Sequence, residues 1–225
     1  MQKKLIASCV ALTAYLAVAV APSLVSANPL LTHPTGTVAA AGTKVVATNV
    51  GETVFTTPFG NVTCSTVTLT GSITSNSTAA GFDIEVTSAT EGGTGPQAPN
   101  EPHTECTSWT GGVSVTPSPA TNGLPWCIQA TASNDAVQIR GGGCPALARA
   151  TRFTLVFTSI GTCVYQWTSA MSGTLLTHPT DAVLQFTEQE WTKLDGPALC
   201  PGSGKMDVSF TLETDTGGEP IYISS

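Results

Sequence analysis

The sequence predicts an all-β protein: an antiparallel β-sandwich, immunoglobulin-like in broad architecture only, or a barrel, in either case stabilised by disulfides. Threonine occurs 37 times in 225 residues, and β-branched side chains pack well on pleated sheets but lose rotamer freedom in helices. Short runs of alternating apolar and polar residues recur, which is the pattern of half-buried strands. Twenty-two glycines and fifteen prolines interrupt these runs, as expected for strands joined by turns.

The alternating runs follow one another along the chain without intervening helical patterns. They are Val67–Ile73, Phe82–Val86, Trp126–Ala130, Val137–Ile139, Phe153–Phe157, Cys163–Trp167, Val208–Leu212 and Ile221–Ile223. Turn-forming residues lie at 133–135, 141–143, 159–161 and 216–218. We expect about ten to twelve strands in all. One segment, Glu188–Leu194, could instead form a short helical turn.

The N-terminal residues have the pattern of an export signal. Lys3 and Lys4 precede an apolar stretch over residues 5–21, and the small or apolar residues at 25–27 fit a signal peptidase site. We therefore expect residues 1–27 to be a signal peptide that is removed on export. The alternative is an uncleaved anchor, which the cleavage motif and the lack of a following basic cluster disfavour.

The chain beyond residue 27 lacks the sequence features that bind a membrane or a nucleic acid. No later stretch approaches 18 apolar residues, so we expect no membrane insertion after cleavage. Cys9 lies at the start of the first apolar run rather than after it, which argues against a lipid anchor. Without Lys3 and Lys4, the eight basic residues become six against fifteen acidic ones, a net charge of −9. This balance disfavours nucleic acid, because phosphate contacts need lysine and arginine.

We expect residues 28–225 to form a single β-rich domain. Residues 91–102 are rich in glycine and proline and predict a long loop. The alternative is a linker between two domains, but the flanking segments have too few apolar residues for two independent cores. A bond between Cys64 and Cys106, which flank this stretch, would tie it into one domain.

Six cysteines follow the expected cleavage point, and this even number predicts three disulfides formed in an oxidising compartment. Fifteen pairings are possible for six cysteines. The sequential set is preferred: Cys64–Cys106, Cys127–Cys144 and Cys163–Cys200. Cys127 opens one expected strand and Cys144 closes the next, around the turn at 133–135, so these two should meet at the open end of a hairpin. No C-x-x-C pair occurs, which argues against a thioredoxin-like or structural zinc site.

No catalytic site, metal site or cofactor is predicted. The chain lacks a G-x-S-x-G elbow, and residues 201–205 lack the full pattern of a phosphate loop. His33, His103 and His178 are too few and too dispersed to favour a metal centre. Carboxylates occur in pairs that would share a solvated strand face rather than oppose each other across a cleft. These pairs are Asp83/Glu85, Glu101/Glu105, Glu188/Glu190 and Glu213/Asp215.

Two tryptophans are candidates for ligand binding. Trp126 and Trp167 lie on apolar strand faces, which predicts that they belong to the core. Trp109 and Trp191 do not follow such a pattern, so they could instead form a platform on which a sugar stacks.

The hexapeptide Leu-Leu-Thr-His-Pro-Thr occurs at residues 30–35 and again at 175–180. Its proline should hold the preceding histidine in an extended conformation and end a strand. We therefore interpret the hexapeptide as the same strand-to-turn segment occurring at two places in the chain. Asn61 and Asn76 begin glycosylation sequons, which matter only in a host that glycosylates exported proteins.

Five segments together resemble a group of secreted, cysteine-containing, β-rich proteins of high-GC actinobacteria that has no assigned activity. These segments are Phe59–Cys64, Leu124–Cys127, Phe153–Leu155, Cys163–Gln166 and Phe210–Asp215. The resemblance implies export and a β architecture, and it assigns no site residues.

The sequence therefore favours an exported, acidic, non-enzymatic β protein of the cell envelope or the medium. One alternative is a carbohydrate- or ligand-binding module, with contact to the cell wall or a glycan. A second alternative is a secreted hydrolase that uses paired carboxylates.

Overall fold

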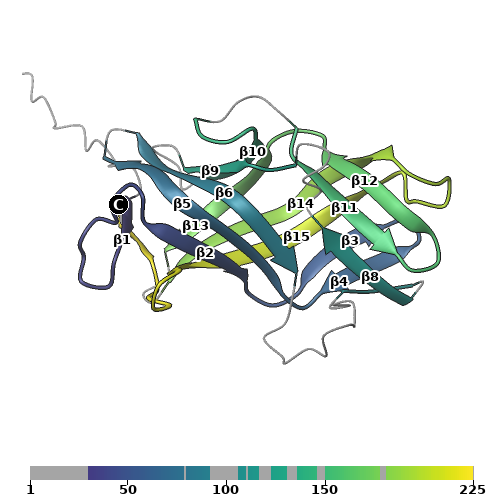
Figure 1. Ribbon diagram of the computed structural model, residues 1–225, viewed down its shortest axis with the longest axis horizontal. Helices are drawn as coiled ribbons and strands as arrows, with labels where there is room; N and C mark the ends of the chain where they lie inside the picture. The colour runs from purple at the N-terminus through teal and green to yellow at the C-terminus, as the bar shows by residue number, and fades with distance from the viewer. Residues whose placement is uncertain are drawn as a thin grey trace, which may run out of the picture.

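The computed structural model describes residues 30–78, 80–91, 106–109, 111–116, 123–130, 136–145, 150–177 and 181–224 (Figure 1). The expected signal peptide, nearly all of the expected 91–102 loop, the turn at 133–135, His103 and His178 lie outside these residues. Within the described residues the chain is all-β, which confirms the predicted fold class. In the same residues, no helix has the length and apolar character needed to cross a membrane.

The described part of the chain forms sixteen strands. They are β1 (Leu30–Thr32), β2 (Lys44–Asn49), β3 (Thr53–Thr57), β4 (Gly60–Cys64), β5 (Val67–Ser77), β6 (Gly81–Glu91), β7 (Cys106–Ser108), β8 (Gly111–Thr116), β9 (Trp126–Ala130), β10 (Ala136–Gly141), β11 (Arg152–Phe157), β12 (Gly161–Trp167), β13 (Met171–Thr177), β14 (Ala182–Asp195), β15 (Ser203–Thr214) and β16 (Tyr222–Ser224). The expectation of ten to twelve was too low, in part because β1 and β7, with three residues each, are too short to display an alternating pattern.

Fourteen of the strands form one closed antiparallel ring, and an additional pairing between β14 and β15 divides it in two. On one side, β13, β10, β9, β6, β5 and β2 join the N-terminal part of β14 to the C-terminal part of β15. On the other side, β12, β11, β8, β7, β4 and β3 join the remaining parts of the same two strands. The result is a closed barrel-like arrangement with two lobes, which lie side by side along the long axis (Figure 1).

A bulge lets β14 serve both lobes. The register of β14 against β15 shifts between Phe186 and Gln189, and Glu188 has a positive φ of 52°. The Asp207 carboxylate accepts the Glu188 backbone N–H at 2.7 Å. The possible helical turn at Glu188–Leu194 is therefore wrong: these residues continue the strand, since β12 and β15 pair with them on either side.

The two lobes have cores of different composition, and we name them accordingly. The interior of the aliphatic lobe, which contains β2, β5, β6, β9, β10 and β13, is mainly branched aliphatic. Its buried residues include Val45, Ile73, Ile84, Val86, Ile128, Val137, Ile139, Leu175 and Leu184. The aromatic lobe, which contains β3, β4, β7, β8, β11 and β12, is filled by rings. These are Phe55, Phe153, Phe157, Tyr165, Trp167 and Trp191.

Phe153 is the centre of the aromatic lobe. Its ring lies 4.5 Å from that of Trp167, 5.2 Å from those of Phe55 and Tyr165, and 5.9 Å from that of Trp191. Such tilted, stacked and edge-on ring pairs stabilise the core beyond the burial of their surface. Close ring packing also requires glycine: a Cβ on Gly204 would lie 2.3 Å from Trp191 Cζ2 and 2.2 Å from the Thr56 carbonyl oxygen.

Three disulfides join Cys64 to Cys106, Cys127 to Cys144, and Cys163 to Cys200. This confirms the sequential pairing, which the sequence analysis preferred among the fifteen possible ones. The first and third bonds belong to the aromatic lobe, and the second to the aliphatic lobe. At the second bond, the backbone N–H groups of Gly142 and Gly143 donate to the Pro125 carbonyl, so the chain turns back toward Cys127.

The two ends of the described chain meet at the aliphatic lobe. Strand β1 pairs with β16, and the Asn76 side chain fixes β1 to β5. Its amide oxygen accepts the Leu31 N–H at 3.0 Å, and its amide nitrogen donates to the carbonyls of Leu31 and Ala39 at 2.8 Å each. Both amide hydrogens of this sequon asparagine are thus engaged in the folded protein.

The two hexapeptide copies use the same residues differently. Each begins in a strand, β1 or β13, as predicted. In the first copy the second leucine, Leu31, is buried, whereas in the second copy the first leucine, Leu175, is buried and Leu176 is 41% exposed. In the described residues, the leucine pairs of the two copies therefore present opposite faces to the core.

Candidate ligand site

A cavity of about 60 Å³ lies where the two lobes meet. Strands of both lobes and the shared strand β15 surround it. The lining residues are Thr53, Phe55, Val67, Leu69, Ala89, Thr90, Trp126, Ile139, Phe153, Trp167, Met171, Met206, Val208 and Phe210. Alternation along each strand explains this convergence, because the same strand face that builds a lobe core also reaches the junction.

Tryptophans from the two lobes meet at the cavity. Trp126 of β9 and Trp167 of β12 lie edge to face, with ring centroids 6.1 Å apart. Both side chains are almost completely buried, which confirms their predicted place in the core. Their indole nitrogens are buried and have no hydrogen-bond partner among the described residues. The indole rings therefore line the cavity with carbon.

The cavity reaches solvent at the ends of β5 and β6. Val67 and Ala89 are half-buried, and Thr90 is exposed, whereas Leu69, which pairs with Ala89, is buried. Since Val67, Ala89 and Thr90 are the lining residues that are not buried, we place the mouth of the cavity at these three residues. A partly open, carbon-lined cavity can take an apolar group, since apolar pockets favour apolar ligands and stay dry without them.

Trp191 does not form a binding platform, so that expectation was wrong. Its side chain is 0% exposed and lies 4.6 Å from the ring of Tyr165. Because residues 188–194 were interpreted as a possible helical turn, Trp191 was not recognised as a strand residue whose side chain is directed into the aromatic lobe. Burial also raises the pKa of the neighbouring Tyr165 phenol well above its usual range.

Trp109 is at the surface, 37% exposed, in the turn after β7. Its ring lies 5.4 Å from the buried Phe157 and 6.0 Å from Phe59, which is 57% exposed. The Trp109 ring also lies over Gly60. Phe59 and Trp109 thus form an aromatic patch on the aromatic lobe, and neither of them lines the cavity.

The described carboxylate pairs lie along single strands or at a strand end, as expected. Asp83 accepts a hydrogen bond from the Gln129 amide at 3.0 Å, and Glu85 accepts the Cys144 N–H at 3.2 Å. Glu188 is exposed and forms an ion pair with Lys205 at 3.2 Å. In these cases the carboxylate has a structural partner. Glu101 and Glu105 lie outside the described residues.

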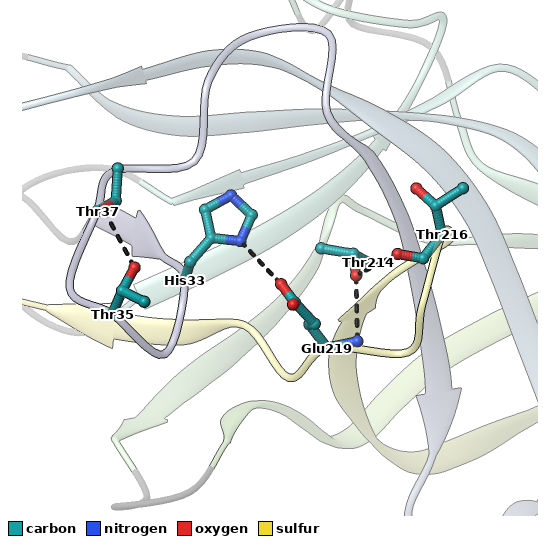
Figure 2. Close-up of polar contacts among 6 residues, drawn as sticks. All are labelled: His33, Thr35, Thr37, Thr214, Thr216 and Glu219. Carbon is teal, nitrogen blue, oxygen red and sulfur yellow. Dashed lines mark hydrogen bonds and ion pairs between the residues drawn. The ribbon is translucent and has the colours of Figure 1, made fainter.

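Among the described histidine, cysteine, aspartate and glutamate side chains, no group of three lies close enough to hold a metal ion. His33 instead lies 3.7 Å from the Glu219 carboxylate, in a contact between the turn after β1 and the turn before β16 (Figure 2). That contact is structural in character, since it joins the two ends of the described chain.

Comparison of the chain with protein-family models, with curated proteins and with solved structures finds no match. Sequence reasoning assigned Trp126 and Trp167 to the core but missed the cavity between them. The only signal was that both belong to strands with strongly apolar faces, and that signal does not distinguish a packed junction from a hollow one.

Proposed function

We propose that the protein is exported and acts, without catalysis, by binding a small apolar group in the cavity between its lobes. The observation that carries this proposal is the carbon-lined cavity with its mouth at Val67, Ala89 and Thr90. Three disulfides support export, because such bonds persist in oxidising compartments. The pattern of residues 1–27 supports the same conclusion.

The experiment is to measure binding of xenon and cyclopropane by the oxidised protein. Xenon is followed by its nuclear magnetic resonance shift, and cyclopropane by tryptophan fluorescence, because Trp126 and Trp167 line the cavity. We expect saturable binding of both probes. Ala89→Leu should weaken binding by narrowing the mouth, whereas Thr174→Leu, at an exposed position on β13, should not. Absence of binding by the folded wild-type protein would overturn the proposal.

The aromatic patch of Phe59 and Trp109 favours a second candidate function, contact with a glycan of the cell wall. Aromatic rings at a surface offer an apolar face beside polar neighbours, which suits the two-faced character of a sugar. Trp109 is the most exposed of the four tryptophans. Quenching of its fluorescence by soluble cell-wall glycans, lost in Trp109→Phe, is the expected result; equal quenching in the variant would contradict it.

A further inference from the structure

We infer that the cavity takes the hydrocarbon end of a dispersed, elongated amphiphile, whose head group stays in solvent beyond the mouth. This inference rests on the proposed function and names the chemical class of its ligand. It follows from the size of the cavity, the chemistry of its wall and the position of its opening.

The cavity is too small for a complete ligand of ordinary size. Its volume is about 60 Å³, whereas an engineered cavity that binds benzene measures about 150 Å³, and pockets for drug-sized ligands occupy about 300–1,000 Å³. Only part of such a molecule would fit. Since the cavity opens to solvent, the rest of the molecule can remain outside.

The wall admits hydrocarbon and rejects polar groups. The buried indole nitrogens of Trp126 and Trp167 are covered, so they offer no donor to an inserted group. A hydroxyl or carbonyl placed inside would lose its water without gaining a partner, which is unfavourable. Met171 and Met206 also line the cavity, and methionine adapts readily because its side chain is flexible. A chain end can therefore be accommodated with little strain.

The surroundings of the mouth favour a single dispersed molecule over a bilayer. In the described residues, the exposed large apolar side chains, such as Phe59, Leu176 and Leu199, do not line the cavity. The residues that line the cavity therefore contribute no large exposed apolar side chain that could enter a membrane. The excess of fifteen acidic over eight basic residues further favours a neutral head group over an anionic one.

The test uses n-alkyl glucosides of increasing chain length, each below its micelle concentration, with tryptophan fluorescence and calorimetry as readouts. Each added methylene should raise the affinity about fourfold while the cavity fills, and the gain should then stop. Ala89→Leu should abolish the dependence on chain length, and Thr174→Leu should retain it. Thermal unfolding of both variants shows whether each is folded.

The outcomes separate this inference from the proposed function. If xenon and cyclopropane bind but affinity for the glucosides does not depend on chain length, the inference is overturned and the proposed function stands. Chain-length dependence that persists in folded Ala89→Leu would also overturn the inference, since the chains would then bind elsewhere. Binding to phosphatidylcholine vesicles without binding to monomeric glucosides would overturn it too. If no probe binds, both proposals fail.

Discussion

The aliphatic and aromatic lobes share two strands but obtain their stability differently. The aliphatic lobe is packed mainly by Val, Ile and Leu side chains and contains one disulfide, whereas the aromatic lobe contains two disulfides and most of the large rings. Six buried side-chain polar atoms have no partner among the described residues. They are Trp126 Nε1, Thr151 Oγ1, Thr154 Oγ1, Tyr165 OH, Trp167 Nε1 and Trp191 Nε1, and all but the first belong to the aromatic lobe.

This difference indicates that side-chain packing stabilises the aliphatic lobe, whereas disulfides contribute more to the stability of the aromatic lobe. Large rings bury much apolar surface, but the polar atoms of tryptophan and tyrosine are costly when buried without partners. A disulfide offsets such costs by restricting the unfolded chain. We therefore expect the aromatic lobe to depend on its disulfides more than the aliphatic lobe does. The cavity lies at the junction, where the two kinds of packing meet.

The largest expected effect comes from removing both disulfides of the aromatic lobe. The loop-entropy relation gives about 3–4 kcal/mol for each bond, and the total stability of a domain is about 5–15 kcal/mol. Replacing Cys64, Cys106, Cys163 and Cys200 by Ser should therefore leave little or no cooperative unfolding. The control, Cys127→Ser with Cys144→Ser, should lower the free energy of unfolding by about 3 kcal/mol and leave the protein folded. Denaturant unfolding measures both, and equal losses for the two variants would contradict the comparison.

Gly204→Ala should sharpen the comparison by crowding the aromatic lobe alone. The new Cβ would lie 2.2 Å from the Thr56 carbonyl oxygen and 2.3 Å from Trp191 Cζ2, well inside van der Waals contact, and such overpacking of a core costs at least about 1–3 kcal/mol. The matched control is Gly202→Ala, two residues away, where nothing lies within 4 Å of the added Cβ. Thermal unfolding should show a lower melting temperature for the first variant and little change for the second. The same melting temperature for both would contradict the close approach of Gly204 to Trp191.

Tyr165 tests whether unpartnered polar atoms cost the aromatic lobe stability. Its hydroxyl is buried without a partner among the described residues, so Tyr165→Phe should leave the free energy of unfolding unchanged or raise it by about 1 kcal/mol. A loss greater than about 1 kcal/mol would show that the hydroxyl has a partner.

The pH dependence follows from the same residue. Burial raises the pKa of Tyr165 in the folded protein, while in the unfolded chain tyrosine ionises at about pH 10. The unfolded chain therefore loses this proton first, and the free energy of unfolding should fall as the pH rises above about 10. In the Tyr165→Phe variant, the free energy of unfolding should fall less steeply over the same pH range. Parallel pH profiles for the two proteins would contradict this assignment.

The sequence was sufficient for the strand class and for the Cys127–Cys144 pair, because both depend on short-range patterns, whereas the other two pairs were preferred only as sequential partners. Alternation revealed the core faces of Trp126 and Trp167, and the hairpin between Cys127 and Cys144 placed those two sulfurs together. The division into two lobes could not be predicted, since it depends on a bulge that redirects β14. Trp191 was misassigned for the same reason: the bulge at Glu188 breaks the strand period, so the segment resembles a helical turn.

The cavity and the outcome for Trp109 show a different limit. A void depends on how distant strands meet in three dimensions, and residue types alone do not determine whether a junction is filled. Trp109 was singled out because it lacks an apolar strand pattern, and its exposure in the turn after β7 agrees with that reasoning.

The smallest expected effect is at the contact between the chain ends, outside both lobes. His33 Nδ1 and the Glu219 carboxylate are 3.7 Å apart, with side chains 27% and 62% exposed, and Figure 2 shows the two facing each other across the turns. Exposed ion pairs contribute about 0–1 kcal/mol, and this one requires a protonated histidine. Glu219→Gln should therefore change the free energy of unfolding by less than about 1 kcal/mol, as should the exposed control Glu52→Gln. A larger loss in Glu219→Gln alone, measured by denaturant unfolding, would mean that the pairing of β1 with β16 depends on this ion pair. We expect no such dependence, because the backbone hydrogen bonds between β1 and β16 and those of the Asn76 side chain hold β1 in place without the ion pair.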